Sequence, residues 1–189
     1  MLTQAAPAGS SDARFRDAMA AVCSPVAVVT TSDGDHVSGT TVSAFCSLSM
    51  DPPMILVSLD NSSRLLAEVR RNRHFGVNVL AADQGALARQ FASKDSYKFE
   101  GVDFRLSGET PRLTGSAAWV KGILRGAYTD GDHTILIGLV TEADATAAPP
   151  LTYYRSHIRH ARPGVAARLL TTGTSSRFPR SRVQTDRED

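Results

Sequence analysis

The 189-residue sequence has few cysteines, few aromatic residues and no long apolar runs. Its two cysteines, Cys23 and Cys46, are far too few for a disulfide framework. Cys46 is expected to pack inside a buried strand rather than to act as a nucleophile. No apolar run approaches the roughly 20 residues that a membrane helix needs, and no signal peptide is visible at the N-terminus. These absences predict a cytoplasmic protein that does not enter a membrane.

Nucleotide-binding and metal-binding motifs are also missing. Neither G-x-G-x-x-G nor G-x-x-x-x-G-K-[ST] occurs, so a Rossmann or P-loop domain is excluded. His157 and His160 are spaced i, i+3, but no carboxylate or cysteine joins them, and no metal site is expected. The net charge of +2 comes from residues after Pro163, where five arginines face three acidic residues. A neutral body predicts no nucleic-acid surface.

The chain has the length and composition of one soluble globular domain. We predict a disordered arm over residues 1–10, a single domain over 11–162, and a flexible basic tail over 163–189. Short strand-like segments outnumber helical ones, and few strand–helix–strand units recur. This pattern favours a mainly β barrel with peripheral helices over a doubly wound sheet.

Local signals place the elements of this barrel. Asp33-Gly34 is expected to turn a hairpin, and Asp83 to cap a helix. Residues 101–113 are expected to be mostly loop. Helices are predicted over about 11–21, 62–73 and from 83, and strands over 26–31, 38–49, 54–57, 75–80, 119–128 and 134–141.

The stretch from His36 to Asp60 is the most informative part of the chain. Its first half consists of small, hydroxyl-bearing and β-branched residues, which suit a strand that a ligand can approach closely. Asp51-Pro52-Pro53 forces a turn, and Met54–Val57 is an apolar run typical of a fully buried strand. A flat ligand with polar edges could lie along the first half.

Four segments in this order resemble the flavin reductase family. Gly39–Pro53 resembles its flavin-binding signature, and the resemblance extends from about Phe15 to about Ile158. The later segments are Arg89-Gln90-Phe91-Ala92-Ser93-Lys94 through Phe99, then Gly131-Asp132-His133, and finally Pro150-Leu151-Thr152-Tyr153-Tyr154-Arg155.

The resemblance implies an FMN-binding split β-barrel of Greek-key type that assembles as a homodimer. Such proteins are reductase components of two-component flavin-dependent monooxygenases. The implied reaction transfers a hydride from NADH to FMN, and reduced flavin then diffuses to a partner monooxygenase. FAD and NADPH remain the alternative flavin and nucleotide.

A phosphate site is predicted at Ser62, Ser63 and Arg64. They begin a predicted helix, where free N–H groups and the helix dipole attract anions, although an ordinary N-cap is the alternative. The resemblance assigns this segment to the ribityl phosphate and adds a second flavin-contacting segment: Ala92, Ser93 and Lys94. Lys94 and Lys98 could balance the phosphate charge or could simply be solvated, and Ser93 is preferred to either.

The flavin ring is expected to lie against backbone N–H groups, which stabilise charge near its N1 and C2 carbonyl. The resemblance assigns flavin contacts to two segments: Thr40, Thr41, Val42, Ser43 and Ala44, and Ser58, Leu59 and Asp60. An ordinary barrel strand with outward polar residues is the alternative for the first segment.

His133 is the candidate catalytic residue. Gly-Asp-His is by itself typical of a turn with an exposed histidine, but the resemblance places this histidine near nicotinamide and flavin. Because hydride transfer needs no general acid, His133 is assigned to positioning and electrostatics. Tyr154 and Arg155 match a segment near the dinucleotide, whose pyrophosphate Arg155 could bind.

Three other functions remain open on the same barrel. The protein could retain FMN and reduce another acceptor, or it could store flavin without catalysis. A pyridoxamine-phosphate-oxidase-like barrel is the third. The fold does not separate these functions, whereas His133 with Tyr154 and Arg155 favours those that use a dinucleotide.

Overall fold

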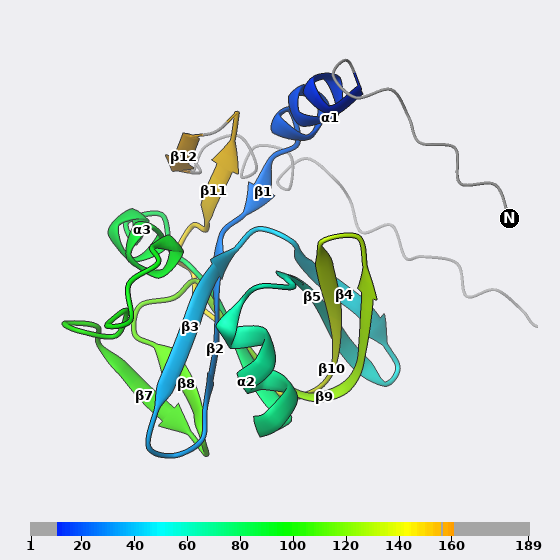
Figure 1. Cartoon of the computed structure of the whole chain (residues 1–189). Coiled ribbons are helices and arrows are strands. Elements are labelled where there is room, and N and C mark those ends of the chain that lie inside the picture. The colour runs from blue at the N-terminus through cyan, green and yellow to red at the C-terminus, as the bar shows by residue number, and fades with distance from the viewer. Residues whose placement is uncertain (1–10, 156, 161–189) are drawn as a thin grey trace, which may run out of the picture.

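A computed structural model describes residues 11–155 and 157–160. The predicted arm over 1–10 and the predicted tail over 163–189 lie outside the described residues. Within them, strands dominate and helices lie at the periphery, as predicted (Figure 1).

A seven-stranded antiparallel sheet forms the body of the molecule, in the order β3-β2-β6-β9-β10-β5-β4. It curls so that α2 fills one open side, between β3 and β10 (Figure 1). Its strands are β2 (Ala27–Ser32), β3 (Val37–Val42), β4 (Phe45–Met50), β5 (Pro53–Asp60), β6 (His74–Val79), β9 (Ala118–Asp130) and β10 (His133–Ala145).

Two smaller sheets and three helices complete the described fold. One small sheet has the order β1-β11-β12, and the other is the hairpin β7–β8. These elements are β1 (Ser24–Pro25), β7 (Phe104–Ser107), β8 (Thr110–Leu113), β11 (Leu151–Tyr154), β12 (His157–His160), α1 (Ser11–Ala20), α2 (Arg64–Asn72) and α3 (Gly85–Ala92).

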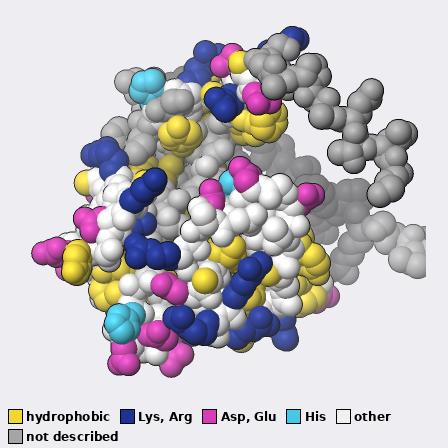
Figure 2. Space-filling view, viewed as in Figure 1, with side chains coloured by type: hydrophobic (Ala, Val, Ile, Leu, Met, Phe, Trp, Pro, Cys, Tyr) yellow, Lys and Arg dark blue, Asp and Glu magenta, His cyan; other side chains and the backbone are white. Residues whose placement is uncertain are grey.

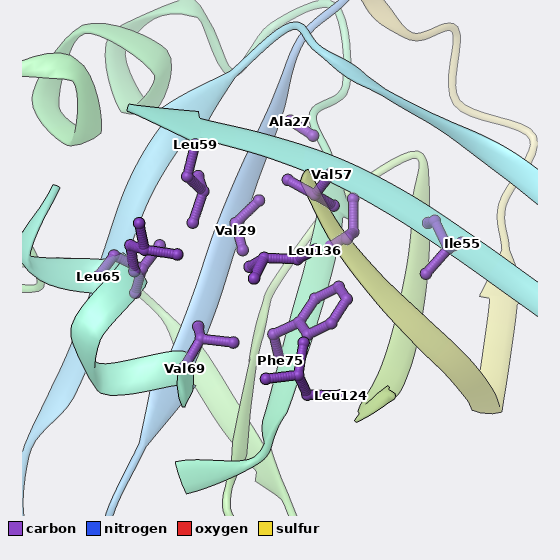
Figure 3. Close-up of a cluster of buried hydrophobic side chains, with 12 residues drawn as sticks. Ala27, Val29, Ile55, Val57, Leu59, Leu65, Val69, Phe75, Leu124 and Leu136 are labelled. Atoms are coloured by element: carbon purple, nitrogen blue, oxygen red, sulfur yellow. The ribbon is translucent and has the colours of Figure 1, made fainter. Parts of the chain in front are cut away.

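The main core lies between the curled sheet and α2. Leu65, Leu66 and Val69 form the buried face of the helix, as their spacing predicts. Figure 3 shows Leu65 and Val69 projecting from the helix towards side chains of the strands, among them Val29 and Phe75. This packing fixes the position of α2 and of its N-terminus.

A second core holds α3 against the outside of the sheet. It is formed by buried residues of α3, the strands and the loops: Val26, Val28, Leu80, Ala88, Phe91, Leu113 and Leu151. Phe99 makes edge-to-face contacts with Phe91 and Phe104, with ring centroids 4.9 and 5.1 Å apart. These contacts anchor the chain that follows α3.

The structure corrects several predictions from the His36–Asp60 stretch. The expected strand over 38–49 is broken at Ser43-Ala44 into β3 and β4. Met54–Val57 alternates between half-buried and buried positions instead of being fully buried, because one face of β5 points away from the core. Cys46 is exposed, so its predicted burial is wrong.

Other corrections concern caps and loops. Residues 101–113 contain the hairpin β7–β8, whose turn residue Gly108 has a positive φ of 57°. The residue before α3 is Gln84, not Asp83, and the Gln84 side chain accepts a hydrogen bond from the backbone of Ala81 at 2.9 Å. The predicted turns at Asp33-Gly34 and at Gly131-Asp132 are confirmed.

Candidate functional site

A cleft of about 1350 Å³ runs along the molecule between β3, α2 and the chain that follows α3. Predicted flavin contacts from four segments line it: Thr40, Asp60, Ser62, Ser63, Arg64, Ala92, Ser93 and Lys94. Figure 2 shows basic side chains gathered between α2 and α3, and acidic side chains with a histidine near the tip of the β2–β3 hairpin. The cleft therefore brings the predicted phosphate-contacting residues 62–64 together with the second predicted flavin-contacting segment, residues 92–94.

The N-terminus of α2 opens into this cleft. Ser63 is the N-cap, and its hydroxyl makes no capping hydrogen bond to the helix. The N–H groups of Arg64 and Leu65 and this hydroxyl thus remain available as donors, whereas the N–H of Leu66 donates to the carbonyl of Ser63 at 3.1 Å. The exposed Arg64 adds a positive charge. This is a geometry that fits a phosphate.

Asp60 holds the approach to the helix in shape. Its carboxylate accepts hydrogen bonds from the backbone N–H of Ser62 at 2.7 Å and from the Ser62 hydroxyl at 2.6 Å. These bonds, with a smaller contribution from His133, hold the pKa of the Asp60 carboxyl below its usual range. The Ser62 hydroxyl is therefore already hydrogen-bonded to Asp60, whereas the Ser63 hydroxyl makes no capping hydrogen bond.

Lys98 lines the cleft. From the sequence, Ser93 is preferred to Lys98 as a flavin contact. The Nζ of Lys98 donates to the carbonyl oxygen of Phe91 at 2.9 Å, and the Thr40 hydroxyl donates to the same oxygen at 3.5 Å. Partial burial and the charge of Arg64 lower the pKa of Lys98, against the opposing effect of Asp95. Two cations thus converge on one part of the cleft.

The residues that follow Thr40 in the first predicted flavin-contacting segment have different surroundings. Thr41 donates from its hydroxyl to the carbonyl of Ala88 at 2.7 Å, which ties β3 to α3. Val42 packs on the main core, and Ser43 and Ala44 form the bend before β4. Among these residues only Thr40 lines the cleft.

Ser58 and Leu59 lie on β5 beside that bend. The backbone N–H of Ser58 donates to the carbonyl of Ala44 at 2.9 Å. The Leu59 side chain is buried in the main core. Only the backbone of Leu59 is left for contact with a ligand.

His133 begins β10 directly beside the cleft. It pairs with Asp60 of β5, although it does not itself line the cleft. Its ring Nδ1 lies 2.7 Å from Asp132 Oδ1, and this contact holds the pKa of the Asp132 carboxyl below its usual range. The side chain is about half exposed, at 47%, so His133 is reachable from solvent at the Asp60 edge of the cleft.

Asn61 joins the helix start to the turn that carries His133. Its backbone N–H donates to Asp132 O at 2.9 Å, and its side-chain Nδ2 donates to Gly131 O at 3.2 Å. Its Oδ1 accepts a bond from the Thr134 hydroxyl at 2.8 Å. From the sequence, Asn61 is part of the predicted helix start but has no role of its own; an amide between a strand and a serine-rich helix start is the signal that points to it.

Tyr154 and Arg155 lie away from the cleft. Tyr154 ends β11, and the backbone N–H of Arg155 donates to the carbonyl of Ala20 at the end of α1. The Arg155 guanidinium lies over the Tyr154 ring, 5.6 Å from its centroid. Within one chain the structure does not bring these residues together with Arg64 or His133.

Residues 11–155 and 157–160 contain no cluster of three His, Cys, Asp or Glu side chains that could hold a metal ion. In the same part of the chain, no helix is both long and apolar enough to cross a membrane.

The described strands form a split barrel, and the cleft on one side of it has a geometry that fits the phosphate of a flavin. The chain belongs to the flavin reductase-like family, because the family model "Flavin reductase like domain" matches residues 19–162.

Relatives and solved structures agree with this assignment. The chain is 35% identical over 160 residues to the reductase component of a 4-nitrophenol 4-monooxygenase/4-nitrocatechol 2-monooxygenase from Rhodococcus opacus, covering 85% of this chain and 86% of the relative. It is 33% identical over 148 residues to the FMN reductase (NADH) SmoA from Agrobacterium fabrum, covering 78% and 84%.

Among solved structures, the NADH:FAD oxidoreductase SgcE6 from Streptomyces globisporus, in complex with NAD and FAD fragments, superposes with a TM-score of 0.77 at 28% identity. The match covers 81% of this chain and 94% of SgcE6. The split-barrel prediction is thereby confirmed.

Proposed function

We propose that this protein is an NADH-dependent flavin reductase that reduces FMN and releases it to a partner monooxygenase. The observation that carries the proposal is the cleft in which Ser63, Arg64, Lys98 and Thr40 converge. Arg64 and Lys98 supply charge for a phosphate, and the free N–H groups of α2 supply donors. Relatives named as reductase components of monooxygenases support the assignment.

The β3 strand provides the surface for the flavin ring. Gly39 lacks a side chain, and a Cβ there would lie 2.8 Å from the Phe91 ring, so this residue type lets β3 pack closely on α3. Thr40 beside it lines the cleft, and its hydroxyl donates to the carbonyl of Phe91. Backbone groups from Thr40 to Ala44 are proposed to face the polar edge of the ring, which would then extend from the cleft at Thr40 towards the bend at Ser43-Ala44. Fixed dipoles there stabilise negative charge.

His133 is proposed to orient the nicotinamide. The chemistry that a bound flavin supplies is acceptance of a hydride at N5 from nicotinamide C4. The role of His133 is to hold the donor at the Asp60 edge, where its ring is fixed by Asp132. Tyr154 and Arg155 lie outside the cleft within one chain, and their contact with the dinucleotide stays a prediction.

Solvent exposure of the anchoring residues supports release of the flavin. Ser62, Arg64 and Lys94 are all exposed. Phosphate contacts made at the surface are screened by solvent and salt, which favours exchange over permanent retention. This supports reduced flavin as a diffusing product.

A homodimer is proposed on the apolar outer face of the sheet. Ile123, Tyr128 and Ile135 are 42%, 64% and 41% exposed on neighbouring strands, and Ile135 pairs with Tyr128 across β10 and β9. A contiguous exposed apolar face of this kind is typical of a subunit interface. Sedimentation of the purified chain would test the proposal, and a monomer at micromolar concentration would contradict it.

Steady-state NADH oxidation with added FMN, FAD or riboflavin tests the reductase assignment. We expect turnover that scales with free FMN, and NADH to be used in preference to NADPH. A flavin-retaining enzyme would carry flavin through gel filtration and would not require added FMN. A storage protein would bind flavin without oxidising NADH, and that result would contradict the proposal.

A further inference from the structure

The cleft continues well past the proposed phosphate anchor. Its volume of about 1350 Å³ exceeds the roughly 300–1,000 Å³ of ordinary ligand pockets. Beyond Arg64 it is lined by the outer face of α2 and by the tip of the β2–β3 hairpin: Glu68, Arg71, Asn72, Asp33, Asp35 and His36. We call this part of the cleft the distal end.

The distal end follows one stripe of α2. Glu68 is four residues after Arg64, and Arg71 is seven residues after it, so all three lie on the cleft side of the helix. At 1.5 Å per residue, Glu68 lies about 6 Å and Arg71 about 10 Å along the helix axis from Arg64. In FAD a second phosphate joins the anchored phosphate to the adenosine ribose, so this ribose would lie past Arg64 along the stripe, beside Glu68.

An ion pair closes this end of the cleft. Arg71 Nη2 lies 3.3 Å from Asp33 Oδ2, which joins α2 to the hairpin. The other oxygen of Asp33 accepts the backbone N–H of His36 at 3.0 Å. Arg71 is thus already engaged by a carboxylate, and it is not a free cation for a second phosphate.

Glu68 carries a negative charge, opposite to the positive charge of Arg64 at the proposed phosphate site. It is half-buried, and among the described residues it forms no ion pair and no side-chain hydrogen bond. Asp35, on the facing hairpin, is likewise without an ion pair in that part of the chain. A partly buried carboxylate is stabilised by hydroxyl donors and is repelled by phosphate.

We propose that the distal end binds the ribose of an adenosine whose 2′- and 3′-hydroxyls are both free, with Glu68 as the principal acceptor. This proposal rests on the proposed function, because it takes the phosphate at Arg64 as the reference point. FAD carries such a ribose beyond the phosphate at Arg64, whereas NADH carries one that is not joined to that phosphate and would enter the distal end alongside the bound flavin. An adenosine with a 2′-phosphate, as in NADPH, is disfavoured by Glu68 and Asp35.

The test uses the full chain with Glu68→Ala, and with Asp35→Asn as a second variant on the facing hairpin. Asp83→Asn is the matched control, because Asp83 is an exposed carboxylate outside the cleft. Calorimetric titration gives Kd for FMN and FAD. Initial rates with FMN as acceptor give KM for NADH and NADPH.

If the ribose belongs to FAD, Glu68→Ala raises the Kd of FAD about ten-fold, as expected for a lost charge-assisted hydrogen bond, while the Kd of FMN stays unchanged. If it belongs to NADH, the KM for NADH rises and the ratio of KM for NADPH to KM for NADH falls. The proposal is overturned if neither the FAD Kd nor the NADH KM differs from the Asp83→Asn control. It is also overturned if FMN and FAD weaken equally.

These outcomes stay separate from the fate of the proposed function. A wild-type chain that binds FAD and FMN but does not oxidise NADH would disprove the reductase activity. The Kd values would still decide whether Glu68 contacts the adenosine ribose of FAD.

Discussion

His133 and Asp60 face each other across the register of β10 and β5. Asp60 orders the start of α2, where the phosphate is proposed to bind, and His133 is proposed to hold the nicotinamide. The antiparallel pairing therefore places the proposed phosphate site and the proposed nicotinamide-binding residue on neighbouring strands. Asn61 reinforces that connection by donating hydrogen bonds to the carbonyl groups of both turn residues, Gly131 and Asp132.

Arg64→Ala should weaken FMN binding about ten-fold or more, because it removes a charge-assisted contact to the phosphate. Fluorescence titration of the variant with FMN and with riboflavin checks this. Riboflavin, which has no phosphate, should bind the variant and the wild type equally. An equal loss for both ligands would show that Arg64 does not act on the phosphate.

Lys98→Met should weaken FMN binding more than Lys94→Met. Lys98 donates a hydrogen bond to the carbonyl of Phe91 beside Thr40, and its burial and the charge of Arg64 lower its pKa. Lys94 is exposed and has no side-chain hydrogen bond or ion pair among the described residues. Kd values for FMN at low and moderate salt would measure the difference. The opposite ranking would move the second cation of the site to Lys94.

Much of this arrangement could be predicted from local sequence. Apolar spacing located the buried face of α2, and Asp33-Gly34 and Gly131-Asp132 located two turns. The position of Lys98 could not be predicted in this way. It depends on Phe99 contacting Phe91 and Phe104, and Phe104 belongs to the hairpin β7–β8, for which the local sequence predicts a loop.

Errors of burial have a similar origin. Cys46 and Met54–Val57 have the residue types of a core, and the depth to which each side chain is buried depends on which face of the curled sheet it occupies. A strand pattern shows alternation but does not show which face another element covers. The separation of Tyr154 and Arg155 from the cleft likewise depends on the pairing of β11 with β1, which no local signal reveals.

Asn61→Ala should slow NADH-dependent flavin reduction by about ten-fold while changing FMN affinity less. The side chain binds Gly131 and Thr134, so its loss lets the turn before His133 shift, and small misplacements cost large factors in rate. Single-turnover rates for Asn61→Ala, His133→Ala and the double variant measure this. Because Asn61 is proposed to act through His133, the double variant should be no slower than His133→Ala; fully additive losses would contradict that role.

His74 should make the protein less stable as the pH falls below 6.5. Burial lowers the pKa of His74 from 6.5, Lys121 adds to this effect, and Glu109, 3.6 Å from Nε2, opposes it. The unfolded chain therefore takes up a proton at a higher pH than the folded chain. The free energy of unfolding should fall towards lower pH by at most about 1.4 kcal/mol per pH unit from this group.

Urea unfolding between pH 7 and pH 5 measures this slope, in a window above the ordinary range of the carboxylates. His74→Gln removes the titrating group and keeps a polar side chain beside Thr110, whose hydroxyl lies 2.9 Å from His74 Nδ1. The variant should lose the slope. An unchanged slope would assign the effect to another group.

The central claim is that the chain passes a hydride from NADH to flavin with His133 holding the donor. Anaerobic stopped-flow mixing of NADH with the protein and FMN, followed by flavin absorbance, tests it most directly. The account predicts bleaching that saturates with NADH, slows with NADH deuterated at C4, and slows by up to about a hundred-fold in His133→Ala while FMN affinity is kept. Bleaching no faster than that of free FMN with NADH would contradict the reductase activity. Fast bleaching that His133→Ala leaves unchanged at every NADH concentration would contradict the role of His133.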